Sequence, residues 1–299
     1  MTKTIAQLRC QTGCTRATSA AGPAQAAGRL AVASPGGPVR PGWRGAWLLG
    51  AALLAMSLPA AAHQIWIEPA QSGALVVRFG EYGENLREVS PGLLDRFGKP
   101  EATLLTGGEA RAVALTRDRD GFASGVTPKD GDGLVAEDAA FPLSTFKQGE
   151  RTVTSWYRPG ARFATSMAEP RPRLALDLLP AGEPGRFRVT WQGRPAGRAK
   201  VGIVVAAGWS KEAIADDDGL VRFDLPWQGL YLLETSRIDR TPGQRDGASG
   251  KERYDGVNHV TTLLIRQATG IEPLPAGPAA TPNPPPQPNP RPGPNSQPK

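Results

Sequence analysis

Short apolar runs, each bounded by turn-forming residues, are the feature that most restricts the fold of this chain. They are clearest between residues 172 and 268, where clusters of Gly, Pro and Asp separate them. The runs read RLALDLL, RFRVTW, AKVGIVVAA, LVRFDL, GLYLLETSR and HVTTLLIR. Runs of this length that end at turns are typical of strands in an antiparallel sandwich, and no long helical periodicity competes with them. The sequence therefore predicts an all-β domain over residues 172–268.

A weaker form of the same pattern covers residues 63–168. The runs here are HQIWIEP, ALVVRFGEYG, EATLLTG, EARAVALTR and RTVTSWYRPG, again with turn residues between them. Residues 167–172, MAEPRP, form a natural linker to the second region. We therefore expect two tandem antiparallel β-sandwich domains of immunoglobulin-like or prealbumin-like type, at residues 63–168 and 172–268.

The C-terminal residues 271–299 differ sharply in composition from the rest of the chain. They are rich in Pro and contain almost no bulky apolar side chain. Such a segment buries too little surface to offset its ordering entropy. The sequence predicts a disordered Pro-rich tail.

Residues 1–62 have the pattern of a Sec-type export signal with a long n-region. Arg40 and Arg44 precede the apolar stretch Ala46–Leu58, and small residues follow it up to Ala62. The stretch is about as long as a signal h-region and too short to cross a bilayer. We expect cleavage after Ala62, a periplasmic or secreted protein, and no membrane span in the mature chain.

The charge balance argues against a nucleic-acid partner. The whole chain has a formal net charge of +7, but residues 1–62 hold six of its 35 Lys and Arg and none of its 28 Asp and Glu. The mature chain would therefore carry 29 basic and 28 acidic residues. Binding through the release of phosphate counterions needs a larger positive excess than this. Both cysteines, Cys10 and Cys14, also lie before the cleavage point, so the exported chain would have no thiol or disulfide.

Cleavage after Ala62 would give His63 a special chemical position. An N-terminal histidine offers both its α-amine and its ring Nδ1 to one metal ion. The mature chain has a single further imidazole, His259, in the segment DGVNHVTTLLI. Nitrogen ligands of this kind suit Cu(II), Ni(II) or Co(II). We therefore predict a transition-metal site at His63 and His259, with a carboxylate or Tyr82 near the axial positions.

Other interpretations of these residues stay open. His63 can be an idle exposed residue behind a cleavage site, and His259 a structural residue at the start of a strand. The exported chain has no Cys and no Gly-x-Ser-x-Gly elbow, so hydrolysis by a nucleophilic side chain is disfavoured and we do not expect an enzyme. Two alternatives remain: a metal-free binding or structural module of the cell envelope, and an oxidative copper enzyme in which the two histidines brace the metal.

Three segments resemble a known family. AHQIWIEP after the leader, the region from GRPAGRAKVGIVVAAGW to GLYLLETS, and DRTPGQRDGASGKERYDGVNHVTTLLI are similar to exported bacterial proteins of a domain-of-unknown-function family that is often labelled nickel or cobalt uptake. The resemblance covers roughly residues 63–267. The middle section also resembles prealbumin-like sandwiches of the carboxypeptidase-regulatory or collagen-adhesin-B type. The resemblance implies a periplasmic accessory protein of metal uptake, which works with a metal-uptake transporter or an outer-membrane receptor.

Overall fold

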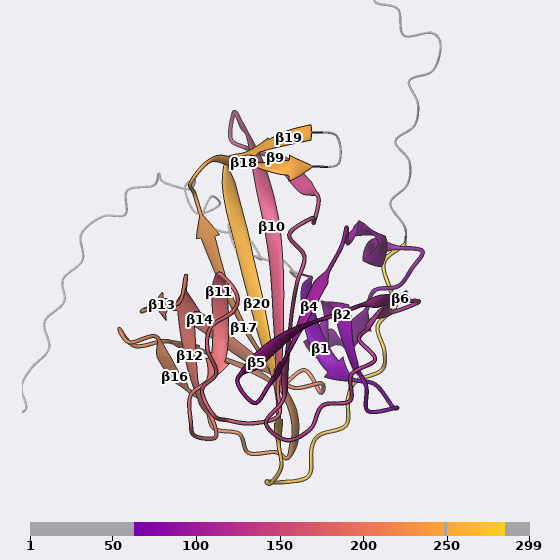
Figure 1. Ribbon diagram of the computed structural model, residues 1–299, viewed down its shortest axis with the longest axis vertical. Coiled ribbons are helices and arrows are strands. Elements are labelled where there is room, and N and C mark those ends of the chain that lie inside the picture. The colour runs from indigo at the N-terminus through magenta and orange to yellow at the C-terminus, as the bar shows by residue number, and fades with distance from the viewer. Residues whose placement is uncertain (1–62, 248–249, 285–299) are drawn as a thin grey trace, which may run out of the picture. The chain divides into compact units, whose positions relative to one another are not determined.

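The computed structural model describes residues 63–247 and 250–284 (Figure 1). The described residues all belong to one compact unit. Its regular structure is β-strand apart from two short 3-10 helices, η1 (Tyr82–Glu84) and η2 (Leu93–Arg96), so the all-β fold expected from the sequence is confirmed. The predicted leader, with its cleavage point and both cysteines, lies outside the described residues. Within the described ranges, no helix has the length and apolar character needed to cross a membrane.

The largest sheet has nine strands. They are hydrogen-bonded in the order β15-β14-β17-β20-β10-β8-β4-β5, and β9 pairs with β10 outside this order. The strands are β4 (Glu101–Thr106), β5 (Glu109–Val113), β8 (Gly133–Glu137), β9 (Leu143–Gln148), β10 (Arg151–Ala164), β14 (Lys200–Val204), β15 (Ser210–Ile214), β17 (Gly229–Asp239) and β20 (Gly256–Gln267). We call it the shared sheet, because its strands come from both of the regions that the sequence distinguishes.

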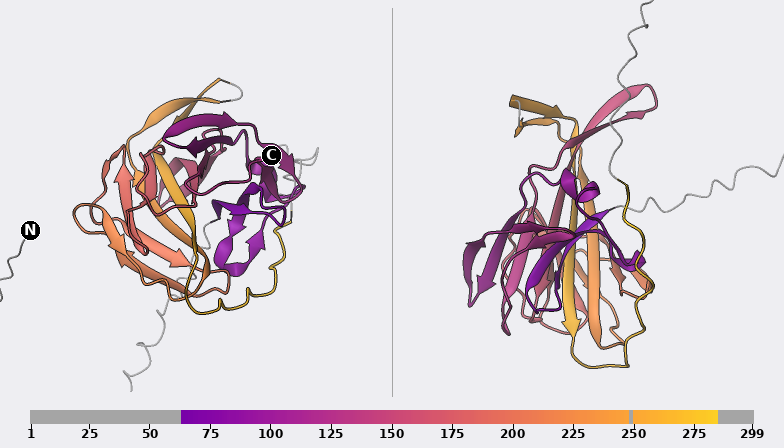
Figure 2. Two further views of the ribbon diagram at one scale, coloured as in Figure 1. Left: turned by 60° about the horizontal axis from the view of Figure 1, so that its bottom comes forward. Right: turned by 90° about the vertical axis from the view of Figure 1, so that its right-hand side faces the viewer.

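Three smaller sheets accompany it. A five-stranded sheet contains β1 (Gln64–Pro69), β2 (Leu75–Glu81), β3 (Leu86–Arg87), β6 (Thr116–Asp118) and β7 (Gly121–Ala123). A four-stranded sheet contains β11 (Leu176–Pro180), β12 (Arg186–Trp191), β13 (Arg194–Pro195) and β16 (Leu220–Arg222). The last is the hairpin of β18 (Gly243–Gly247) and β19 (Gly250–Tyr254), which projects at the same end as the hairpin of β9 and β10 (Figure 2).

The centre of the shared sheet is a parallel pair. β10 and β20 run side by side in register from Ser155 opposite Gly256 to Ala164 opposite Ile265. A parallel pair needs a long crossover connection, and here the crossover holds strands β11 to β19. The boundary predicted at residues 168–172 follows β10, so the sheet continues across it. The number of independently folding domains stays a prediction, but the two regions are joined by backbone hydrogen bonds at β10 and β20.

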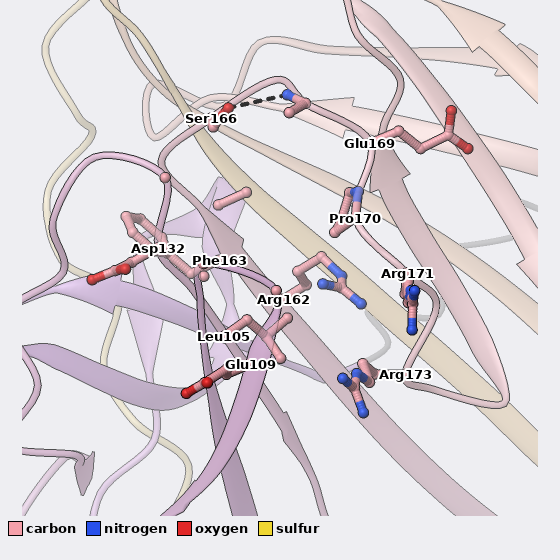
Figure 3. A pocket seen from close by; sticks show the side chains of 16 residues that line it. Leu105, Glu109, Asp132, Arg162, Phe163, Ser166, Glu169, Pro170, Arg171 and Arg173 are labelled. Carbon is pink, nitrogen blue, oxygen red and sulfur yellow. Dashed lines mark hydrogen bonds between the residues drawn. The ribbon is translucent and has the colours of Figure 1, made fainter.

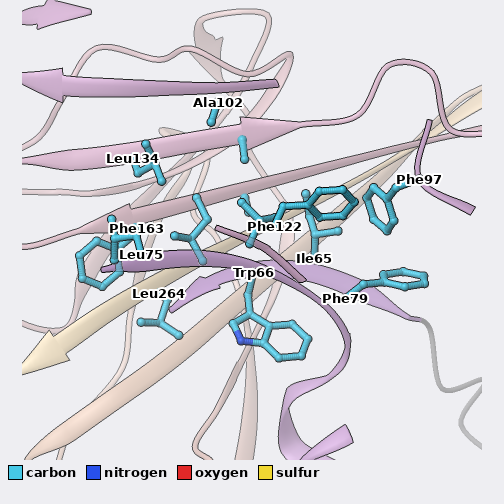
Figure 4. Packing of buried hydrophobic residues seen from close by; sticks show 14 of the residues in the cluster. Ile65, Trp66, Leu75, Phe79, Phe97, Ala102, Phe122, Leu134, Phe163 and Leu264 are labelled. Carbon is cyan, nitrogen blue, oxygen red and sulfur yellow. The ribbon is translucent and has the colours of Figure 1, made fainter. Parts of the chain in front are cut away.

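The two faces of the shared sheet bury separate cores. Successive side chains of a strand point to opposite faces, and β20 follows this rule. Leu264 belongs to a first core against the five-stranded sheet, which Figure 4 shows with Trp66 and Phe79. Leu263 and Ile265 belong to a second core against the four-stranded sheet.

Two buried threonines of β20 confirm which sheet lies on which face. The hydroxyl of Thr262 donates to the carbonyl of Ile65 in β1, at 2.7 Å. The hydroxyl of its neighbour Thr261 donates to the carbonyl of Leu176 in β11, also at 2.7 Å. The five-stranded sheet therefore covers one face of β20 and the four-stranded sheet covers the other.

Candidate metal site

His63 lies directly before β1, with its ring between two carboxylates. Its Nε2 is 2.6 Å from Oε1 of Glu88, and its Nδ1 is 3.5 Å from Oε1 of Glu81. The ring also packs against Phe79, with 5.1 Å between the ring centroids. The His63 side chain keeps 22% of its surface exposed, while that of Glu88 is wholly buried. The Nε2 edge of the imidazole is therefore held inside the protein, and part of the side chain stays exposed.

A tight reversal of the chain brings the two carboxylates together. Glu81 ends β2, and β3 returns along it, so that Gly80 pairs with Arg87 and Glu81 with Leu86. The turn contains Asn85 in the left-handed conformation, at φ 50°. Gly80 also has a positive φ, of 145°, and a Cβ there would collide with the carbonyl oxygen of Leu86. Glycine at position 80 thus permits the close return that places Glu88 beside the start of β1.

The hydrogen bond to Glu88 engages the Nε2 nitrogen of His63 and leaves Nδ1 facing Glu81. A carboxylate accepts hydrogen bonds, so Nε2 at 2.6 Å carries the proton. In the neutral ring Nδ1 then has its lone pair available on the side of Glu81. A histidine that binds a metal through one nitrogen usually donates its other N–H to a carboxylate or carbonyl. His63 and Glu88 show this arrangement, with the Nε2–H donated to a carboxylate.

The backbone of His63 is also fixed. The Tyr157 hydroxyl of β10 donates to the His63 carbonyl oxygen at 2.8 Å. Burial raises the pKa of Tyr157, and the carboxylate of Glu234 raises it further. The phenol therefore stays protonated and keeps donating. This bond anchors the residue that precedes β1 to the shared sheet.

His259, the second predicted ligand, lies on the opposite face of that sheet. In the register of β10 and β20 it pairs with Arg158, whereas Tyr157, the preceding residue of β10, reaches His63 on the other face. The His259 ring is 7% exposed and packs edge-on against Trp191, with 4.9 Å between centroids. Because the sheet separates the two imidazoles, the structure does not bring them together. The two predicted ligands therefore lie at separate places in the structure, and a metal at His63 stays a prediction.

The electrostatics around His259 fit a structural residue. Burial is the largest cause that lowers the pKa of His259, to about 4, and the positive charges of Arg158 and Arg237 lower it further against the opposing effect of Asp239. The ring is therefore neutral near pH 7. Tyr82, the expected axial neighbour, is 3% exposed and packs edge-on against Trp66 in the first core.

The C-terminal residues reach the same region. Residues 271–284, which the sequence predicts to be disordered, run along the domain, and we call them the C-terminal strap. Ile271 bridges to Trp227. Further on, the Asn85 side chain donates to the carbonyl of Gly277 at 2.7 Å, and the Asn85 carbonyl accepts from the backbone N–H of Ala280 at 3.3 Å.

The strap ends on the His63 site. The backbone N–H of Asn283 donates to Glu88 Oε2 at 3.0 Å, and its side-chain amide donates to Glu88 Oε1 at 2.5 Å. The same amide nitrogen is 3.3 Å from Nε2 of His63. Glu88 thus has polar partners from both ends of the described chain. Sequence reasoning missed both Glu88 and Asn283, and the turn signal in GEYGEN was the one local hint that the chain doubles back here.

Two cavities are relevant to binding. One, of about 760 Å³, includes His63, Phe79 and Tyr157 in its lining. Another, of about 440 Å³, lies between the end of β10 with the residues that follow it, the β4–β5 turn and the start of β8 (Figure 3). In this second cavity Arg162 is already held by Asp177 through two bonds, at 3.0 and 2.6 Å, and both charge signs occur in the lining. No histidine lines the second cavity, so the first is the one that concerns the candidate site.

The side chains around His63 offer few donor atoms to a metal ion. Across residues 63–247 and 250–284, no group of three or more His, Cys, Asp or Glu side chains is placed to hold a metal. At His63 the side chains supply two donors, Nδ1 and Glu81 Oε1, because Glu88 occupies the other ring nitrogen. Their 3.5 Å separation is less than two metal–ligand bonds of about 2.0–2.2 Å, so one ion can reach both. A third donor, the α-amine of His63, would exist after cleavage at Ala62.

Comparisons with known proteins identified no related protein. No family model matches this chain, and no characterised protein or solved structure matches it significantly.

Proposed function

We propose that the exported chain is a periplasmic accessory protein that binds one Cu(II), Ni(II) or Co(II) ion as cargo at His63. The α-amine and Nδ1 of His63 and the carboxylate of Glu81 hold the ion, and Glu88 orients the ring. The protein then passes the ion to or from a metal-uptake transporter or an outer-membrane receptor. The observation that carries the proposal is the imidazole placed between two carboxylates, with its Nδ1 turned to Glu81, the less buried of the two.

The donor set supports this class of metal. Two nitrogens and one carboxylate oxygen are borderline donors that suit late first-row ions, and their affinity for such a site rises from Co(II) through Ni(II) to Cu(II). The α-amine and the imidazole must both be deprotonated to bind, so the affinity should fall as the pH is lowered.

The first experiment tests the amine. Protein exported with its own signal should begin at His63 by mass spectrometry and bind about one equivalent of Cu(II) in a competition titration. A version with one extra glycine before His63 loses the α-amine from the site. We expect its affinity to drop by more than about a hundredfold, beyond the 10–100-fold typical of losing an outer-shell partner. Equal Cu(II) affinity of the two versions would show that the α-amine is not a ligand.

The second experiment tests Glu81. Glu81→Gln removes the anionic donor 3.5 Å from Nδ1, so Cu(II) affinity should fall by about tenfold or more. Glu84→Gln is the matched control, because Glu84 is exposed in the same turn and has no ion-pair partner within the described residues. Both variants remove one negative charge. An equal loss in the two would show a general charge effect and contradict the role of Glu81.

The two alternative functions depend on different features. The oxidative copper enzyme needs both imidazoles at one ion, and His259 lies on the far face of the shared sheet. The metal-free envelope module draws support from a different observation, the larger cavity beside His63.

A further inference from the structure

The larger cavity lies where the first core opens to solvent beside His63. Phe79, Phe141 and Tyr157 line it and pack against one another, with 6.2 Å between the centroids of Phe79 and Phe141 and 5.0 Å between those of Phe141 and Tyr157. The hairpin of β9 and β10 forms one wall, and the ends of β17 and β20 form another. Its volume of about 760 Å³ is within the range of about 300–1,000 Å³ that small-molecule sites occupy.

Two large apolar side chains of this cavity are unusually exposed. Phe146 of β9 keeps 50% of its surface exposed and Ile238 of β17 keeps 59%. Phe146 lies opposite Val153 in the hairpin register, so both belong to the wall that faces the cavity. Grouped apolar side chains that stay in contact with water commonly mark a binding surface. Here they extend the aromatic lining of the cavity to its mouth.

The charged residues around the mouth are mainly positive. Arg96, Arg151 and Arg240 line the cavity, and none of them has an ion-pair partner in the part of the chain that the structure describes. The one acidic residue of the lining, Asp255, accepts a hydrogen bond from the backbone N–H of Thr154 at 2.7 Å. Guanidinium groups bind carboxylates through paired, charge-assisted hydrogen bonds and also stack on aromatic rings. The cavity therefore combines an aromatic interior with a cationic rim.

We propose that this cavity binds a small organic dianion, with a flat aromatic body and two carboxylate groups. The body packs among Phe79, Phe146 and Tyr157, and the carboxylates meet the arginines at the rim. A bare metal ion would leave most of the volume empty, and a purely aliphatic acid would leave the aromatic surface unused. His63 also lines this cavity, but none of the three arginines is a proposed metal ligand, so the dianion can be tested without metal.

Isothermal titration of the mature protein in excess EDTA tests the proposal without any metal. Isophthalate is the probe, isophthalamide is its neutral counterpart, and glutarate carries similarly spaced carboxylates without the ring. Isophthalate should bind at one site. Isophthalamide, which lacks the charged hydrogen bonds, and glutarate, which lacks the aromatic contact, should each bind at least about tenfold more weakly. Absence of isophthalate binding at millimolar concentration, or equal binding by either control compound, would overturn the proposal.

Substitutions then locate the site. Arg151→Glu and Arg240→Glu should each weaken isophthalate binding by about tenfold or more. Arg111→Glu is the matched control, because Arg111 is exposed on β5 and does not line the cavity. Phe146→Ser should weaken isophthalate and leave glutarate unchanged. All four positions are exposed, so unchanged thermal melting is expected to confirm the fold of each variant. An equal effect at Arg111 would show that only net charge matters and would overturn the assignment.

Discussion

The imidazole Nε2 of His63 lies 2.6 Å from Oε1 of Glu88, a carboxylate with no exposed side-chain surface. A buried carboxylate is costly unless hydrogen bonds satisfy it, and His63 supplies one of them while Asn283 supplies two. The pairing has a second consequence for the ring, because it leaves Nδ1 as the nitrogen that meets Glu81. The same hydrogen bond therefore both satisfies the buried carboxylate of Glu88 and orients the ring of His63.

Replacing Glu88 tests this interaction. Glu88→Gln keeps the size of the side chain but removes the anionic acceptor that fixes the ring proton on Nε2. We expect Cu(II) affinity to fall by about 10–100-fold, as for other lost outer-shell partners of histidine ligands. The measurement is a competition titration with a chromophoric chelator, and Glu84→Gln serves again as the control. Wild-type affinity in Glu88→Gln would show that Glu88 does not orient the ligand.

The C-terminal strap should control access to His63. Removing residues 272–299 eliminates the three contacts that Asn283 makes with Glu88 and His63. We expect the His63 ring to react several-fold faster with diethyl pyrocarbonate, because a group that covers one side of it is gone. Mass spectrometry of the modified N-terminal peptide measures the rate. Removing only residues 285–299 keeps these contacts and should leave the rate unchanged, and equal rates in all three chains would contradict the prediction.

Glu234 should make the protein less stable as the pH rises. Burial raises the pKa of Glu234 to about 7 from its ordinary 4.5, and its Oε2 has no hydrogen-bond partner among the described residues. The folded state therefore holds a proton that the unfolded state releases, so the free energy of unfolding declines between about pH 4.5 and pH 7 and stays lowered above that. Glu234→Gln should remove this decline and gain up to about 3 kcal/mol at pH 8. Urea unfolding across this range measures it, and parallel pH profiles of the two proteins would refute it.

His259 should produce the opposite trend in acid. Its pKa in the folded protein is lowered to about 4 from 6.5, so its contribution is complete above pH 6.5 and is lost as the pH falls toward 4. His259→Gln cannot gain that proton and should flatten the acid side of the stability curve by up to about 3 kcal/mol. Denaturant unfolding from pH 7 to pH 4 tests this prediction.

The same variant also tests the correction to the metal site. Since the shared sheet separates His259 from His63, Cu(II) affinity of His259→Gln should stay within about twofold of wild type, a difference of less than about 0.5 kcal/mol. The competition titration is run above pH 7, where His259 is neutral in the wild-type protein. A loss of tenfold or more would restore His259 as a ligand.

Local sequence determined where most strands lie. RFRVTW is β12 at Arg186–Trp191, and HVTTLLIR lies within β20, because apolar runs bounded by turn residues carry their own signal within a few residues. The position of His63 at a candidate cleavage point was also visible without a structure. The strand positions and the place of His63 behind Ala62 both depend only on residues adjacent in the chain, so the sequence alone was enough to predict them.

Tertiary structure decided which of these residues meet. The parallel pairing of β10 with β20 joins segments about a hundred positions apart, and no local pattern encodes such a pair. It also sets the face on which His259 lies, because a shift of one residue in register sends a side chain to the other side of a sheet. The return of β3 along β2 buried Glu88 against His63 in the same way. Local sequence thus determined the strands and the candidate residues, while long-range pairing determined which of these residues meet.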